Sequence, residues 1–373
     1  MKLLRFVYSR LTEDLLLLAL VLGFALLAVF TPVAWQQLPA LVDWHTIAIL
    51  AGLMVLSRGL EDSGALVRSG HWLLGRMHSE RQLALAMVLF AALLSAVITN
   101  DVALFIVVPL TLSLGRLASL PVGRLVIFQA LAVNAGSAVS PIGNPQNLYL
   151  WQRSGDSFFT FMWQMLPIAT WMLVALLLLT ALVFSARRVD IHTQAAAHPI
   201  SRQLLRISLV CFPLFLFLVE WGLIAIAVAG VLALYLLCWR RVLQGVDWLI
   251  LLIFILMFVN LGLLARLHFM PPLVDALLAL PGAEITGAVA LSQVISNVPA
   301  TIFLAEFSER WYALAWGANV GGFGLVIGSL ANLIALRLGR QPGLWLPFHG
   351  WSLIMLLLSL LGLIALGGVQ GLQ

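Results

Sequence analysis

The chain has 373 residues, of which 62% are hydrophobic and only 9% are charged. No soluble domain has this balance, and apolar runs long enough to span a bilayer indicate a polytopic, all-α protein of the inner-membrane type. The net charge of +5 comes from arginines in the loops, with Lys2 as the only lysine. This pattern is typical of membrane topology, so we expect a lipid bilayer and no nucleic acid as a partner.

Basic residues at the N-terminal end indicate that it lies in the cytoplasm. Lys2, Arg5 and Arg10 precede a predicted span at 15–30, and the loop 31–41 has no lysine or arginine. By the positive-inside rule this first span runs outward. No small-residue cleavage site comes after it, so we expect a retained span and not a signal peptide.

The segment 82–115 is predicted to be a re-entrant hairpin. It comes after a span at 44–56 and an amphipathic stretch at 64–77, and it has basic residues at both ends, Arg81 and Arg116. A single crossing would leave one basic end outside. Charge alone does not separate a hairpin from two full spans, but both apolar halves are short for full crossings.

A broken span at 125–151 comes next, interrupted by residues such as Gly136 and Pro141. Glycine and proline disfavour a continuous helix, so we expect a break in its middle. A full span at 161–184 ends the first half. The span at 204–219 has no counterpart and acts as a linker that inverts the second half relative to the first.

The second half repeats this order in the opposite orientation. It contains predicted spans at 223–239 and 248–264, an interfacial piece at 270–281, a hairpin at 283–307, a broken span at 314–336 and a span at 344–366. The domains are a first inverted repeat at 1–184, a cytoplasmic loop and linker span at 185–221, and a second inverted repeat at 222–373. We therefore expect about nine transmembrane spans, two re-entrant hairpins and two broken helices, with the C-terminus outside.

Short sequence segments of the first half recur in the second half. LSAVITNDVA at 94–103 recurs as LSQVISNVPA at 291–300, and NAGSAVSPIGNPQN at 134–147 recurs as NVGGFGLVIGSLAN at 319–332. A weaker pair, Asp43-Trp44 and Asp247-Trp248, opens an apolar run in each half. Three matches in the same order make one repeated unit, which is a mark of secondary transporters.

Polar residues at the hairpin tips and helix breaks form the predicted substrate site, because amides and hydroxyls donate and accept hydrogen bonds and broken helices expose backbone groups. The alternative is that they only pack helices closely, but matched pairs in both repeats favour function. The substrate-binding residues would be Thr99, Asn100, Asn134, Gly143, Asn147, Ser296, Asn297, Asn319, Ser329 and Asn332. Candidate ligands of a bound sodium ion are Asn100, Asn134, Asn297 and Asn319, and no other cofactor is expected.

The four matched segments of the repeat (94–103, 134–147, 291–300 and 319–332) are called the core segments. Asp101 is the acid at bilayer depth in them, and its counterpart in the second repeat is Val298. An unpaired carboxylate there costs about 3 kcal/mol or more, so it should hold a cation or a proton. We hypothesise that Asp101 carries the coupling ion or proton. The alternative role is to cap the second half of the hairpin, and the two roles are compatible.

The four core segments contain no arginine, lysine or histidine. The histidines lie near span ends or in loops, where interfacial placement is expected: His45, His71, His78, His192, His198, His268 and His349. An intramembrane hydrolase needs a nucleophile with a base or two facing acids, so we do not expect an enzyme. Asp43 and Asp247 stand at span starts, where helix capping is expected.

At these residues the chain resembles the ion transporter superfamily: citrate-transporter-like permeases, divalent-anion:sodium symporters, arsenite efflux pumps and NhaD-type sodium/proton antiporters. It is also similar to the YbiR-type bacterial inner-membrane proteins. In the symporters a Ser-Asn-Thr signature at each tip helps bind sodium and a substrate carboxylate. Here the tips read TND at 99–101 and SNV at 296–298. The Asn-Asp pair is more like the pumps and antiporters. The resemblance further implies a homodimer whose transport domain moves as an elevator.

These features predict a secondary active transporter of a small ion, driven by a proton or sodium gradient. The resemblance favours an anion, either a carboxylate or an oxyanion. The alternative within this class is a proton-coupled efflux antiporter for sodium or arsenite, which Asp101 favours. A channel or a purely structural protein fits less well, since paired broken elements suit occlusion better than a continuous pore.

Overall fold

A computed structural model of the chain describes residues 15–31, 35–74, 77–115, 120–188, 200–339 and 343–367. The secondary structure of these residues is helical apart from one isolated β-bridge, so the predicted all-α class is confirmed. The N-terminal basic residues, Arg116, the loop histidines and both chain ends lie outside these ranges: Lys2, Arg5, Arg10, Arg116, His192, His198 and residues 368–373.

The helices of the first half lie close to the predicted segments. They are α2 Leu15–Phe30, η1 Trp35–Leu41, α3 Trp44–Asp62, α4 Ala65–Leu74, α5 Glu80–Val97, α6 Asn100–Gly115, α7 Val122–Ser137, α8 Pro145–Ser154, α9 Phe158–Val183 and α10 Arg202–Glu220. The helices α5 and α6 cover the predicted hairpin; α5 is long enough for a full crossing, contrary to the expectation that both halves are short, and re-entrance stays a prediction. The predicted broken span consists of α7 and α8, and residues 138–144 between them are called the first break.

The second half has the same order. Its helices are α11 Ile224–Cys238, α12 Arg240–Gly245, α13 Leu249–Ala265, α14 Met270–Leu278, α15 Ala283–Ile295, α16 Asn297–Leu304, α17 Trp311–Gly321, η2 Val326–Gly328, α18 Leu330–Gly339 and α19 Trp345–Ala365. Here α15 and α16 make the hairpin, α17 and α18 make the broken span, and residues 322–329 are called the second break.

Several helices are suited to a membrane by length and composition. Among the described residues, α5, α9, α10 and α19 are each long and apolar enough to cross a bilayer alone, and α13 with α14 passes the same criterion as a pair bent by 90°. The remaining apolar helices are shorter. These findings support a polytopic membrane protein, while the count of about nine spans stays a prediction.

Helix contacts recur between the two halves. The helix α5 packs on α7 as α15 packs on α17, and α2 packs on α13 as α11 packs on α3. The broken helices exchange partners, since α7 packs on α18 and α17 packs on α8. Each half therefore completes its packing with helices of the other half, which is the arrangement expected of interlocked repeats.

The weak Asp-Trp sequence match corresponds to a shared local structure. The indole N–H of Trp44 donates to the carbonyl of Pro39, five residues earlier, at 2.9 Å. Trp248 donates in the same way to Leu243, also five residues earlier and at 2.9 Å. The aspartate before each tryptophan accepts a backbone N–H from the start of the next helix, as predicted.

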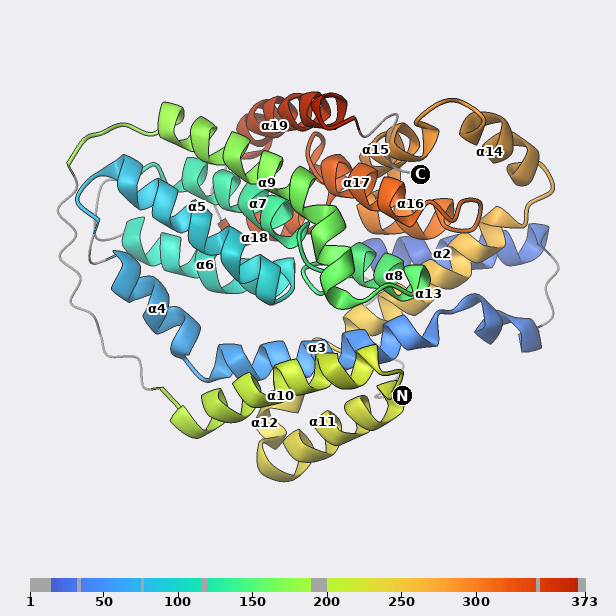
Figure 1. The fold of residues 1–373 in the computed structure, drawn as a ribbon, viewed down its shortest axis with the longest axis horizontal. Coiled ribbons are helices and arrows are strands. Elements are labelled where there is room, and N and C mark those ends of the chain that lie inside the picture. The colour runs from blue at the N-terminus through green and yellow to red at the C-terminus, as the bar shows by residue number, and fades with distance from the viewer. Residues whose placement is uncertain are drawn as a thin grey trace.

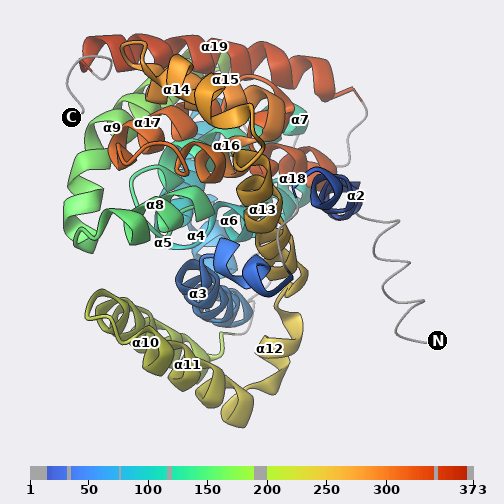
Figure 2. The same ribbon diagram turned by 90° about the vertical axis from the view of Figure 1, so that its right-hand side faces the viewer.

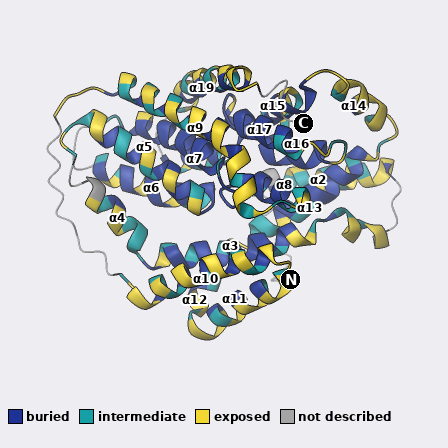
Figure 3. Ribbon diagram, viewed as in Figure 1, coloured by how far each residue is buried: buried dark blue, intermediate teal, exposed yellow. Residues whose placement is uncertain are grey.

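The hairpins and broken helices lie in the middle of the molecule. Figures 1 and 2 show α10, α11 and α12 beside α3 on one side and α19 on the opposite side. Buried residues concentrate in the helices between these layers, and exposed residues line the outward faces of α9, α10, α11 and α19 (Figure 3). Those outward faces carry large apolar side chains such as Leu182, Leu237 and Leu346, which fits a surface in contact with lipid.

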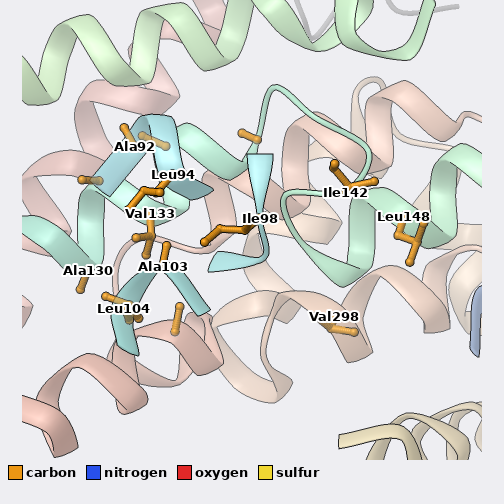
Figure 4. Packing of buried hydrophobic residues seen from close by; sticks show 14 of the residues in the cluster. Ala92, Leu94, Ile98, Ala103, Leu104, Ala130, Val133, Ile142, Leu148 and Val298 are labelled. Atoms are coloured by element: carbon orange, nitrogen blue, oxygen red, sulfur yellow. The ribbon is translucent and has the colours of Figure 1, made fainter. Parts of the chain in front are cut away.

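Small residues let α5, α6 and α7 approach closely around the first hairpin tip. Figure 4 shows Ala92, Ala103 and Ala130, which come from these three helices and are buried. Gly136 of α7 lies directly against the backbone of Ala92 in α5, and Gly321 of α17 lies against the side chain of Ser292 in α15. Such close contacts hold the broken helices against the hairpins.

We expect Gly136→Ala to destabilise the protein, because the added methyl group would meet the backbone of Ala92 and displace α5. Overpacking of this kind costs about 1–3 kcal/mol. Gly230→Ala on α11 is the control, since its methyl group would enter open space. Thermal unfolding of both variants in detergent tests this difference, and equal melting temperatures would contradict the close contact.

Candidate functional site

The first hairpin tip comprises Thr99, Asn100 and Asp101. The N–H of Asn100 donates to the carbonyl of Gly143 at 2.9 Å, which joins the tip to the first break. The Oδ1 of Asn100 accepts the N–H of Asp101 at 2.9 Å, so it satisfies an N–H group at the start of α6. The carboxylate of Asp101 is half-buried and forms no hydrogen bond or ion pair within the described ranges. This leaves it available to a cation or a proton.

The second tip combines backbone strain with unused polar groups. Ser296 has a φ of 75°, the one positive value outside glycine in the described chain. Such a conformation costs about 1–3 kcal/mol and is often found at functional sites. The Ser296 hydroxyl is buried without a partner among the described residues. The side chain of Asn297, also buried, forms no hydrogen bond there either. Asn297 lies against Gly322 of the second break, where an added Cβ would be 3.3 Å from its Nδ2.

Two symmetric amide contacts join the broken helices. The Nδ2 of Asn134 donates to Oδ1 of Asn332 at 2.8 Å, and the Nδ2 of Asn319 donates to Oδ1 of Asn147 at 2.7 Å. Asn134 matches Asn319 in the repeat, and Asn147 matches Asn332, so each contact is the counterpart of the other. All four side chains are buried, with at most 4% of their surface exposed. Buried polar groups of this kind are costly to leave unpaired, so the two contacts tie the halves together.

A second pair of contacts extends this network and adds a residue that the sequence analysis did not select. The Nδ2 of Asn144 donates to Oδ1 of Asn319 at 2.9 Å, and the hydroxyl of Ser329 donates to Oδ1 of Asn134 at 3.0 Å. Asn144 stands opposite Ser329 in the repeat alignment, which is the signal that could have identified it. It also caps α8, directly before Pro145 at the first turn.

Side-chain amides also satisfy the backbone at the two breaks. Asn147 Nδ2 donates to the carbonyls of Ala138 at 3.0 Å and Ser140 at 3.1 Å. At the second break Gln293 of α15 donates to two carbonyls, at 2.8 and 3.0 Å, and accepts one N–H at 2.8 Å. Several of the backbone carbonyls that the helix breaks expose are therefore bonded to side-chain amides, as a dry environment requires.

The citrate transporter family model matches residues 11–309 of the chain. The chain belongs to the citrate transporter family. It is 46% identical to inner membrane protein YbiR of Escherichia coli (strain K12) over 92% of this chain and 91% of that protein. It is 32% identical to uncharacterized transporter MJ0456 of Methanocaldococcus jannaschii over 86% of this chain and 89% of that protein. A shorter match at 32% identity links 39% of the chain with 30% of the silicon efflux transporter LSI3 of Oryza sativa subsp. japonica.

These comparisons confirm the resemblance to citrate-transporter-like and YbiR-type proteins. The family and the names of the relatives indicate a membrane transporter, and YbiR is an inner membrane protein.

In this member of the citrate transporter family the predicted site residues divide into two groups. The break residues hydrogen-bond one another in the network: Asn134, Asn147, Asn319, Ser329 and Asn332. The tip residues retain polar groups without partners in the described chain, as the carboxylate of Asp101 and the hydroxyl of Ser296 illustrate. The binding roles of all these residues stay a prediction, but the geometry favours the tips as the ligand-binding part.

This division predicts unequal effects of two asparagine substitutions on stability. Asn147→Ala removes the donor to Ala138 and Ser140 and the acceptor of Asn319, and should lower the free energy of unfolding by about 3 kcal/mol. Asn297→Ala removes no hydrogen bond of its side chain within the described residues and should cost about 1 kcal/mol or less. Melting temperatures of the purified variants measure both effects. A larger loss for Asn297→Ala than for Asn147→Ala would contradict the proposed division.

Proposed function

We propose that the chain is a secondary active transporter of a small anion, a carboxylate or an oxyanion, coupled to a proton or sodium gradient. The observation that carries the proposal is the set of polar groups at the two hairpin tips that have no partner among the described residues, beside the hydrogen-bonded amide network of the broken helices. A structural protein has no need to keep such groups at this depth, where an unmade hydrogen bond is costly. Membership of the citrate transporter family supports the anion.

The tips offer complementary groups for an anion and a cation. The amides of Asn100 and Asn297 and the hydroxyls of Thr99 and Ser296 can donate to an anion. The helices α6 and α16 begin at the tip asparagines, so their N-terminal ends favour negative charge. The carboxylate of Asp101 can bind the coupling sodium ion or proton. Among the four candidate sodium ligands, Asn134 and Asn319 would first have to give up network hydrogen bonds, so Asn100 and Asn297 are the better ones.

Alternating access would result from the inverted repeat. In the proposed topology the N-terminus is cytoplasmic, the C-terminus is outside, and the two hairpins enter from opposite faces of the membrane. The hairpins and broken helices would move as one body, since the amide network links both halves of it. The helices α2, α3, α11 and α13 would form a scaffold, and two copies of the chain would form a homodimer.

The second candidate function is proton-coupled efflux of sodium or arsenite. The observation that favours it is the half-buried Asp101 carboxylate without a partner among described residues, which can alternate between a proton and a cation. The relative from Oryza sativa that matches part of the chain is named a silicon efflux transporter, which also points to export.

We expect Asn100→Ala and Asn297→Ala each to reduce transport at least about hundredfold, because each removes a ligand of the central site. The measurement is uptake of radiolabelled citrate, arsenite and sodium into proteoliposomes. Gly230→Ala is the control for reconstitution, since it faces open space. Full activity of both asparagine variants, in protein with an unchanged melting temperature, would remove the tips from the site.

Substitution of Asp101 separates the two candidate functions. Proteoliposomes loaded with a pH-sensitive dye are challenged with sodium, lithium, arsenite, and di- and tricarboxylates. If the protein is an efflux antiporter, sodium or arsenite drives proton flux in the wild type, and Asp101→Asn abolishes it because an amide cannot carry the proton. If only carboxylates give flux, and Asp101→Asn keeps that flux, the protein is an anion permease and Asp101 is not its coupling residue.

A further inference from the structure

A histidine far from the tips in sequence reaches the second break. Ser352 of α19 accepts the N–H of Gly324 through its hydroxyl at 2.8 Å, and His349 of the same helix accepts the N–H of Val326 through Nε2 at 3.2 Å. Gln293 holds the same segment through α15. The segment is therefore held by side chains of two helices, and one of these side chains can change its charge.

The contact between His349 and Val326 requires one protonation state of the imidazole. A backbone N–H can only donate, so Nε2 must carry a lone pair where it meets Val326. The other ring nitrogen, Nδ1, lies 2.8 Å from the carbonyl of Trp345, which can only accept, so Nδ1 carries the hydrogen. His349 is thus neutral in this arrangement, and a second proton would place two donors against each other at Nε2.

None of the described elements packed against α19 carries a carboxylate that could stabilise the cationic form of His349. Of the elements packed against α19, the helix α9 and η2 contain no ionisable side chain. The helix α7 contributes Arg124, which lies over the ring of Phe184, and α17 contributes Tyr312, which bonds to Asp156. On the other helices that border the second break, α15 carries Glu284, which pairs with Arg310 at 3.3 Å, and α18 carries Arg337. A proton on His349 would therefore gain no acidic partner from these elements.

No titratable side chain within the described ranges of the chain bonds to the backbone of the first break. Its backbone is held by the amide of Asn147 and by the N–H of Asn100, which do not titrate in the ordinary pH range. The difference between the repeats is chemical, since the packing of the two broken helices is otherwise matched. Protonation of His349 would act on one of the two breaks only.

We propose that His349 is a proton-sensitive clamp on the second break: its neutral imidazole holds Val326 in place, and a proton taken up from water at Nε2 releases it. The inference rests on the proposed transport site and adds a regulator to it. A shift of the break reaches that site, because the carbonyl of Gly322 accepts from Asn332 and the same residue lies against Asn297. The clamp holds while the imidazole of His349 is neutral and is lost when it is protonated, so it is present at the higher pH and absent at the lower pH.

Hydrogen–deuterium exchange of the purified full-length protein tests the clamp without any ligand. At about pH 7.5 and 5.5, after correction for intrinsic exchange, protection of the Val326 amide in the wild type should fall by about tenfold at the lower pH. His349→Gln keeps an acceptor that does not titrate, so its protection should stay constant. His349→Phe has no acceptor and should be unprotected at both values. The control is His268→Gln, at an exposed histidine, which should behave as the wild type.

Transport supplies a second readout that separates this inference from the function on which it rests. Exchange of radiolabelled citrate or arsenite across proteoliposomes, with equal pH on both sides, should show a KM that rises several-fold more in the wild type than in His349→Gln on going to the lower pH, since protonation of the substrate or of Asp101 affects both proteins equally. Unchanged Val326 protection in the wild type, or an equal fall in His349→Gln, overturns the clamp. An equal rise of KM in both proteins overturns its link to transport, while leaving the transporter intact. If neither citrate nor arsenite is transported, the proposed function fails for these substrates. The hydrogen–deuterium exchange of the Val326 amide then still tests the clamp.

Discussion

Every backbone N–H and carbonyl at the two helix breaks needs a partner, because hydrocarbon supplies none and each unmade hydrogen bond there costs several kcal/mol. The structure meets this constraint with side-chain amides. Asn147 bonds to carbonyls of the first break and Gln293 to those of the second. The same need explains why glycines line the helices around the breaks, since only a close approach of backbones brings these amides within reach.

The amide network also separates residues whose side chains are engaged in hydrogen bonds from residues whose polar groups have no partner in the described chain. Asn134 and Asn319 each use their amide on the other half of the chain, so the broken helices form one unit across both repeats. Polar groups at the hairpin tips have no such engagement in the described chain, and Ser296 is held in a strained conformation beside them. A strained backbone or a buried polar group without a hydrogen bond persists only where the surrounding structure holds it in place. The hydrogen-bonded helix breaks hold the tip residues in this way.

The two repeats share their packing and differ in their chemistry. Asp101 occupies the position that Val298 has in the second copy, and Asn144 matches Ser329. Gln293 corresponds to Ala96, whose methyl group cannot bond to the first break as Gln293 bonds to the second. The shared packing of the repeats therefore places each hairpin tip beside a helix break. The positions at which the two repeats differ in sequence give the two halves different charges and different hydrogen-bond donors.

The sequence alone determined the membrane class, the repeat, the order of the helices and the tip residues, because hydrophobic periodicity, glycine, proline and arginine placement act locally. It also located Asn134 and Asn332, which stand 198 residues apart, as candidates. Only the tertiary structure decided that these two bond to each other, that Asn144 and Gln293 bond to the broken helices, and that His349 reaches the second break instead of remaining at the interface. Such pairings depend on how close the backbones come across the two repeats, and no local pattern of residues encodes that distance.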